Sequence, residues 1–262
     1  MLTDPSIVIF RYIIISMKYF WTHKEEIPDS LGYGQFSAVH FLLLVISVLL
    51  ITLFIHIYIH AEEPLRLLMR RGCAFTLIVI EMIKMILIGH SNVKLAEYLP
   101  LEICSFAAYF IVIDSLWAGN TVFPGMLLTL FLPAAIMAIL FPTTSTLPVF
   151  NFYVIHQFLY HDLIIAYILA RFLNREIPLA YPGVWKSIGI ILLLAAAIYL
   201  IDVRFDKNFM FLRDTYGNPL LKMIEKVTGS GVSYTIGLVI FCIFMIHVFY
   251  LIFKFISLLV LY

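Results

Sequence analysis

The stretch HFLLLVISVLLITLFIHIYI, residues 40–59, contains no Asp, Glu, Lys or Arg. A helix needs about 20 apolar residues to cross the hydrocarbon core of a bilayer, so this stretch predicts a membrane span. Six further apolar runs follow it along the chain, which predicts seven spans in all. The predicted spans are residues 40–59, 72–88, 99–117, 122–140, 150–173, 188–201 and 234–260.

The composition agrees with a protein that crosses the membrane several times. Of the 262 residues, 63% are hydrophobic and 13% are charged, whereas about 25% of the residues of an average soluble domain are charged. Mean hydropathy is +1.03. The net charge of +1 provides no long-range field that would attract nucleic acid. These values exclude a soluble globule, a disordered chain and a nucleic-acid-binding protein, and they predict an all-α polytopic membrane helix bundle.

Two parts of unequal size are expected. Residues 1–36 are predicted to form an N-terminal interfacial helix and arm, and residues 37–262 the seven-span membrane domain. Within that domain, residues 202–233 are the longest polar segment and are expected to be the loop between the sixth and seventh spans. Pro124 and Pro133 lie in the fourth span, and proline in a helix interior tilts or kinks it.

The apolar run at residues 7–21 is interrupted by charges. Asp4, Arg11 and Lys18 are spaced seven residues apart, which places them on one side of a helix. We expect this segment to lie on the bilayer surface as an amphipathic helix. An eighth span is the alternative.

Basic residues in the loops indicate the orientation. The short connectors after the first and fifth predicted spans are rich in arginine, which favours the cytoplasmic side. We therefore expect a multi-pass protein of the cell membrane with its N-terminus outside. With seven spans, the N-terminal arm and the loops after spans two, four and six share one side of the membrane, so polar residues at those helix ends can converge.

Three groups capable of proton transfer are expected at that end of the bundle. His40 begins the first span, Glu102 lies at the start of the third, and His156 lies early in the fifth. A charged group in a bilayer costs about 2.5–3.5 kcal/mol on insertion scales, so such residues are expected to face the bundle interior. Their convergence is the main functional signal in the sequence.

Further polar residues lie close to these in the sequence. Glu81 and Lys84 are three residues apart in the second span and are predicted to pair on one helical face, either as a structural pair or as a pair that orients a reactive group. Tyr153 and Tyr160 are predicted to share a helical face with His156, because they lie three residues before it and four after it.

Other residues leave more than one interpretation open. Cys104 is either a small core residue or a nucleophile. His161 is expected to point elsewhere and to pair with Asp162 or a loop residue. His56 and His60 have the spacing of a metal-binding pair, but no third ligand is evident, so neither a metal nor a cofactor is expected.

Five short motifs follow one another between residues 36 and 245. They are Phe36-Ser37-x-x-His40, Leu99-Pro100-Leu101-x-x-Cys104, Phe141-Pro142 followed by Leu147-Pro148, Tyr153-x-Ile155-His156-x-x-Leu159-Tyr160, and Asn208-Phe209-Met210-Phe211-Leu212. In their order and spacing the chain resembles the YwaF-type integral membrane proteins of bacteria. That family is related to an animal TMEM-type membrane acyltransferase that acts on ether phospholipids.

The resemblance implies acyl transfer between membrane lipids through a Cys–His pair, with His156 as the matching histidine and Asn208 as a supporting residue. The animal members carry Pro-Cys-His at the start of the third span. This chain departs from that pattern, because Leu101 occupies the nucleophile position and Glu102 replaces the adjacent histidine. Cys104 lies three positions beyond Leu101, which is nearly one helical turn.

Two classes of function follow from these residues. The first is a lipid acyltransferase or lipid hydrolase, in which His156 is the general base, Glu102 orients it or acts beside it, and Cys104 is the candidate nucleophile. Lys84 or Tyr153 would stabilise an oxyanion. The second is a non-catalytic lipid-binding, transport or membrane assembly protein, in which the same residues bind a headgroup or carry protons. Membrane lipids are the expected partners in both, and a scaffold that docks a protein through residues 202–233 is a third reading.

Overall fold

The computed structural model describes residues 14, 16–117, 119–120 and 123–260. Within these residues every regular element is helical and none is a strand. The helices are α2 (Ala38–His60), α3 (Glu63–Gly89), α4 (Ile103–Leu116), α5 (Phe123–Met126), α6 (Leu132–Leu140), α7 (Phe152–Leu173), α8 (Pro182–Phe205), α9 (Pro219–Thr228) and α10 (Val232–Val260). A π-helical segment, η4 (Leu127–Phe131), joins α5 to α6.

Six helical stretches are long and apolar enough to cross a membrane, which confirms the predicted all-α polytopic bundle. They are α2, α3, the continuous stretch Phe123–Leu140, α7, α8 and α10. The predicted third span is different, because α4 has only 14 residues. At 1.5 Å per residue α4 is roughly 21 Å long, short of a hydrocarbon core of about 30 Å.

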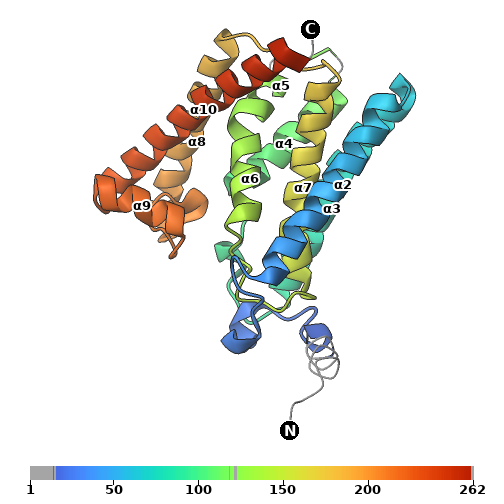
Figure 1. The fold of residues 1–262 in the computed structure, drawn as a ribbon. Helices are drawn as coiled ribbons and strands as arrows, with labels where there is room; N and C mark the ends of the chain where they lie inside the picture. Colours follow the sequence, from blue (N-terminus) through green and yellow to red (C-terminus); the bar gives the residue numbers. More distant parts are fainter. Residues whose placement is uncertain (1–13, 15, 118, 121–122, 261–262) are drawn as a thin grey trace.

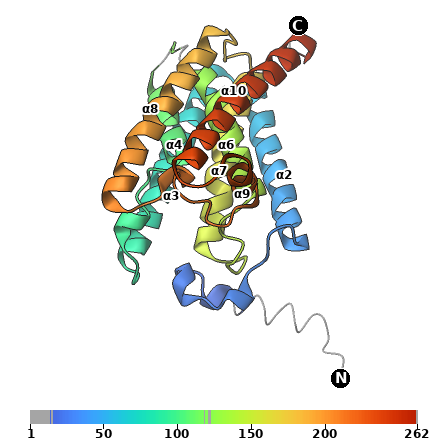
Figure 2. The same cartoon turned by 90° about the vertical axis from the view of Figure 1, so that its left-hand side faces the viewer.

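Helix α7 is the centre of the bundle. In the most apolar 18-residue stretch of α7, 72% of the residues are buried, whereas in the corresponding stretch of α2 only 17% are buried. Figure 1 shows α2 and α3 on one side of α7, and α8 and α10 on the other side beyond α6. Figure 2 shows α10 running obliquely across the helices behind it. The α8–α10 pair contacts the rest of the bundle mainly through η4 and α5.

The fourth span carries the irregularity predicted from its prolines. Pro133 lies in the first turn of α6, directly after the π-helical segment. Because proline has no N–H to donate to the carbonyl four residues earlier, a regular α-helix cannot continue through this position undisturbed. Thr129, within the π-helical segment, bonds through its hydroxyl to Ser187 of α8 at 2.9 Å. Pro124 lies in the first turn of α5, where a proline interrupts no hydrogen bond.

Two segments predicted to be loops contain helix. The polar connector after the first span is expected at residues 60–71, yet α3 already begins at Glu63. Arg66 and Arg70, in the first two turns, pair with Glu63 along the helix, so the charged residues extend α3 instead of ending it. The segment 202–233 holds the 3₁₀ turn η5 (Phe209–Phe211) and the amphipathic helix α9.

The N-terminal arm docks on the end of the bundle where α7 begins. Most of the predicted interfacial helix at residues 7–21 lies outside the described residues, although residues 16–18 are helical. Further along, the N–H groups of Tyr33 and Gly34 donate to the carbonyls of Leu147 and Ser145 at 3.0 and 2.9 Å. The arm is therefore hydrogen-bonded to the loop that precedes α7.

This docking generates a prediction about Gly32. A Cβ atom on Gly32 would lie 2.8 Å from Ser145 O and from the backbone of Thr146, so Gly32→Ala is expected to displace the arm and to destabilise the protein by about 1–3 kcal/mol. The matched control is Gly189→Ala in α8, where a Cβ meets nothing within 4 Å. Thermal denaturation in detergent should separate the two variants, and equal midpoints would contradict the arm's docking.

Candidate functional site

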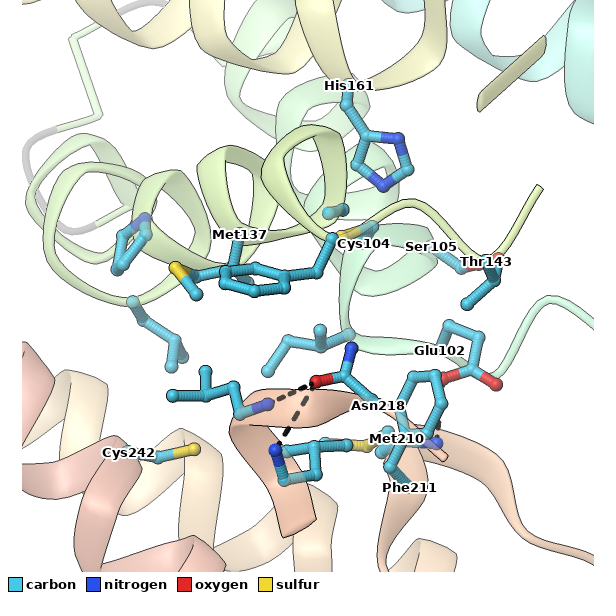
Figure 3. A pocket seen from close by; sticks show the side chains of 18 of the residues that line it. Glu102, Cys104, Ser105, Met137, Thr143, His161, Met210, Phe211, Asn218 and Cys242 are labelled. Carbon is cyan, nitrogen blue, oxygen red and sulfur yellow. Dashed lines mark hydrogen bonds between the residues drawn. The ribbon is translucent and has the colours of Figure 1, made fainter. Parts of the chain in front are cut away.

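A cavity of about 430 Å³ lies between the α3–α4–α6–α7 side of the bundle and the α8–α10 side. Its two walls differ in chemistry. The apolar wall comes mainly from α8 and α10 and includes Ile191, Ala195, Leu238 and Ile246. The polar wall comprises Glu81, Lys84, Glu102, Cys104, Ser105, Tyr153, His156, Gln157, Tyr160 and His161. Figure 3 shows this cavity from close by.

The polar wall is organised around the Glu81 carboxylate. One carboxylate oxygen lies 2.5 Å from Lys84 Nζ, and the other lies 3.1 Å from His156 Nε2. Glu81 and Lys84 thus form the predicted pair on one face of α3. The same carboxylate reaches across to α7, so His156 is held by a residue 75 positions away in the sequence. Glu81, and not Glu102, makes the contact that orients His156.

The imidazole of His156 is further fixed by its neighbour on α7. The rings of His156 and Tyr160 are stacked, with centroids 5.2 Å apart and planes 17° from parallel. This agrees with the prediction that the two residues share a helical face. With Nε2 committed to Glu81 and the ring held flat against Tyr160, only Nδ1 of His156 is left for chemistry. Such a fixed imidazole is the arrangement that general-base catalysis requires.

His161 is also part of the cavity wall, so the expectation that it points elsewhere is wrong. Its Nδ1 lies 2.5 Å from the Gln157 carbonyl of its own helix. Gln157 in turn donates to Ala138 O of α6 at 3.0 Å. The face of α7 that borders the cavity is therefore wider than the single row of Tyr153, His156 and Tyr160.

Glu102 joins the start of α4 to the loop after α8. It precedes the first residue of α4, and its Oε2 accepts a hydrogen bond from the Met210 N–H at 2.8 Å. Burial raises the pKa of Glu102 to about 7, although the Met210 hydrogen bond and the Lys84 charge act in the opposite direction and Asp202 raises it further. A carboxyl group with a pKa near neutrality can accept and return a proton at ordinary pH.

Cys104 borders the cavity from the first turn of α4. Figure 3 shows it beside Ser105, with Cys242 of α10 on the opposite side. Among the described residues, no hydrogen bond joins its thiol to His156; the backbone carbonyl of Cys104 instead accepts from the Tyr160 hydroxyl at 3.5 Å. A reaction through this thiol therefore requires it to approach the imidazole.

Two of the predicted site residues do not border the cavity. His40 is fully buried; its Nδ1 accepts from Phe36 N at 3.0 Å and its Nε2 lies 2.9 Å from Ile139 O. Both ring nitrogens are thus occupied by backbone groups, and His40 ties α2 to the end of α6. The structure brings Glu102 and His156 to one cavity, but the expected convergence does not include His40.

Asn208 holds the turn that follows α8. Its side-chain oxygen accepts from the N–H groups of Arg213 and Asp214 at 2.8 and 3.1 Å, and its amide donates to Asp214 O at 2.8 Å. This turn places Met210 and Phe211 on the cavity wall, with Met210 in the left-handed region at a φ of 54°. Asn208 therefore contacts the site only through the backbone that it shapes.

A second polar cluster at the other end of α7 was missed by the sequence analysis. Arg171 pairs with Asp114 of α4 and, at 2.9 Å, with Glu176. Tyr58 of α2 donates to both oxygens of Glu176 at 2.9 and 3.0 Å. Burial raises the pKa of Glu176, but the hydrogen bonds from Asn174, Arg171 and Tyr58 outweigh it and lower the pKa overall.

The signal for this second cluster was Asp114, a lone acid in an apolar run, but its partner lies 57 residues away. The cluster ties three helices together. Within the part of the chain that the structure describes, neither end of the bundle holds a group of three or more His, Cys, Asp or Glu residues that could bind a metal.

The raised pKa of Glu102 yields a pH-dependent prediction. Between the ordinary value of 4.5 and about 7, folded protein holds a proton that unfolded protein has lost, so this residue lowers stability as the pH rises through that window. Glu102→Gln is therefore expected to raise the free energy of unfolding little at pH 5 and most at pH 8, by at most about 3 kcal/mol. Thermal denaturation at both pH values measures this, and an equal effect at both would contradict the burial of this carboxyl group.

Comparison with known proteins gives the family. No curated protein and no solved structure matches the chain. The sequence model of the TMEM164 family matches residues 35–253. This range contains every residue that borders the cavity and leaves out most of the N-terminal arm. Because the match covers most of its length, the chain belongs to the TMEM164 family.

Proposed function

We propose that this protein transfers or hydrolyses an acyl group of a membrane lipid. One observation carries the proposal: a single cavity joins an imidazole oriented by a carboxylate, His156 with Glu81, to a wall of apolar side chains. Oriented imidazoles activate nucleophiles, and apolar walls suit a lipid. A cavity of about 430 Å³ falls within the range of small-molecule sites, roughly 300–1,000 Å³.

His156 acts as the general base and then as the general acid. Glu81 holds Nε2, and Nδ1 takes a proton from the nucleophile as that nucleophile attacks the ester carbonyl. The tetrahedral intermediate then collapses, the ester C–O bond breaks, and the imidazolium returns the proton to the departing alkoxide of the lipid. Lys84, whose Nζ lies 2.5 Å from that carboxylate, balances its negative charge.

Cys104 is the nucleophile in the two-step form of this reaction. Its thiolate would form a thioester with the acyl group, and a lipid hydroxyl or water, deprotonated by His156, would then break the thioester and restore the thiol. In the one-step form the acceptor hydroxyl or water attacks the lipid ester directly. Leu101 occupies the position at which the animal members carry cysteine, so Cys104, three residues further on, is the thiol that this chain offers on the polar wall of the cavity.

Tyr153 is suited to stabilise the oxyanion. Its hydroxyl is buried and has no hydrogen-bond partner among the described residues, and it borders the cavity one helical turn from His156. A preorganised donor aimed at developing negative charge is worth about 3–4 kcal/mol in other acyl transferases and hydrolases.

The family membership supports the membrane setting of this proposal. The relation to bacterial YwaF-type proteins, the location in the cell membrane and an outward-facing N-terminus are parts of the proposal that follow from the resemblance and the loop charges. The bound lipid is the only partner that the proposal requires.

Replacing His156 tests the role of the imidazole. His156→Ala is expected to lower acyl transfer or hydrolysis about 10²–10⁴-fold, the usual contribution of a general base. The matched control is His247→Ala in α10, whose Nδ1 lies 2.9 Å from Ile243 O of its own helix and which does not border the cavity. The measurement uses the purified protein in vesicles containing a phospholipid with a radiolabelled acyl chain.

The same assay separates catalysis from simple lipid binding. If neither the wild type nor the control releases or transfers label while both retain lipid, the protein is non-catalytic and the proposal fails. If His156→Ala keeps full activity, the reaction occurs without this histidine and the mechanism fails.

The two cavity cysteines test the nucleophile. Cys104→Ala is expected to abolish turnover and to remove any acyl group bound to the protein through a hydroxylamine-sensitive thioester. Cys242→Ala, on the opposite wall of the same cavity, is expected to leave both intact. Trapping the radiolabelled acyl-protein with acid measures the intermediate. Full turnover by Cys104→Ala would instead establish direct attack by the acceptor.

A further inference from the structure

A second hollow lies on the outside of the α8–α10 pair. It has a volume of about 460 Å³, and its walls come from α8 and α10. The bordering residues are Leu192, Ala195, Ala196 and Tyr199 of α8 and Val232, Thr235, Ile236, Val239, Ile240 and Ile243 of α10. Leu192, Ile236 and Ile240 are 47%, 55% and 60% exposed. In a protein with six apolar helices long enough to cross a membrane, such side chains face lipid. We call this hollow the α8/α10 groove.

Two of the residues that border the groove carry a hydroxyl group, Thr235 of α10 and Tyr199 of α8. Thr235 already donates to Leu212 O at 2.7 Å. The other α10 residues that border the groove are valines and isoleucines. Its occupant must therefore be apolar over most of its length.

The groove and the polar cavity share wall residues. Ala195 of α8 and Val239 of α10 border both. Both side chains are of modest size, and among the described residues they are the ones that the groove shares with the cavity that holds His156. A molecule in the groove can thus have one end beside the polar wall while the rest lies against α8 and α10.

The length of the groove matches one leaflet of a bilayer. Residues 232–243 of α10 span roughly 17 Å at 1.5 Å per residue, about half of a hydrocarbon core of about 30 Å. The groove begins where α10 begins, next to α9. The turn η5 contributes Met210 and Phe211 to the polar cavity, and Asn218, the N-cap of α9, also borders it. An extended acyl chain from that side of the membrane has this length and this direction.

We propose that the α8/α10 groove binds one acyl chain of a membrane phospholipid and that Ala195 and Val239 separate this chain from the polar cavity. The proposal rests on the proposed function in one respect, because it places the ester end of the chain beside His156. The binding itself needs no catalysis. It makes residues of the groove the determinants of acyl-chain length.

Two adjacent alanines of α8 provide a matched test. Ala196 borders the groove, whereas the neighbouring Ala197 is exposed outside it, so Ala196→Phe and Ala197→Phe add the same ring inside and outside the groove. Each is made in the full chain carrying His156→Ala, so that lipid is retained and turnover does not affect the result. The protein is placed in phosphatidylcholine nanodiscs that contain a phosphatidylcholine with a diazirine in its acyl chain.

After irradiation, mass spectrometry maps the labelled residues. Labelling of Val239 and Ile243, relative to Leu251 elsewhere on α10, is expected to fall roughly tenfold in Ala196→Phe, the effect of losing the contacts of about two buried methylene groups. Ala197→Phe is expected to match the parent. Equal ratios in all three proteins, or groove residues cross-linked to a second copy of the chain, would overturn the proposal.

The assay also separates the two proposals. Selective groove labelling in a protein whose wild type shows no acyl turnover would support the groove and refute the enzymatic function. Turnover by the wild type together with unselective labelling would do the reverse.

Discussion

A carboxylate inside a membrane bundle must be paired, and the pairing of Glu81 determines the geometry of this site. An unpaired ion at that depth would cost several kcal/mol, so the contacts from Lys84 and His156 serve stability and orientation together. Removing either partner leaves a buried charge with fewer contacts. The relative rotation of α3 and α7 is thereby fixed, and with it the direction in which the His156 ring faces.

The cavity beside this pair depends on the irregular fourth span. The π-helical segment before Pro133 makes the contacts that hold α8 and α10 against the bundle, and the Thr129–Ser187 hydrogen bond reinforces them. Away from that attachment, the hydrogen bond from the Met210 N–H to Glu102 also links the α8–α10 side to the rest of the bundle. The polar and apolar walls are therefore held together at the π-helical segment, and the cavity lies between them away from it. In the proposed function, the lipid ester binds in this cavity.

How far the sequence predicted this structure depends on the range of each interaction. The spans at residues 40–59 and 234–260 were predicted to within two residues of α2 and α10, because a long apolar run with at most one charged residue has few alternatives in lipid. The predicted start of the second span was too late, since Glu63 and its arginine partners stabilise the first turns of α3 outside the apolar region as well.

The face of α7 that bears His156 could be predicted from helical periodicity. Its partner Glu81 could not, because that contact depends on the rotation of a distant helix. His40 was placed at the correct end of the bundle, but its ring bonds to Ile139 O instead of bordering the cavity. Local packing determines that orientation, and the sequence pattern does not show it.

We propose that Glu81 and His156 act as one catalytic unit on a lipid ester. A double-mutant cycle tests this most directly, with the release or transfer of a labelled phospholipid acyl chain measured for Glu81→Gln, His156→Ala and the double variant. Residues that act as a unit show strongly non-additive losses. If the two residues act together, the double variant is no slower than His156→Ala alone. Losses that multiply, or a wild-type protein that leaves the labelled lipid unchanged, would contradict it.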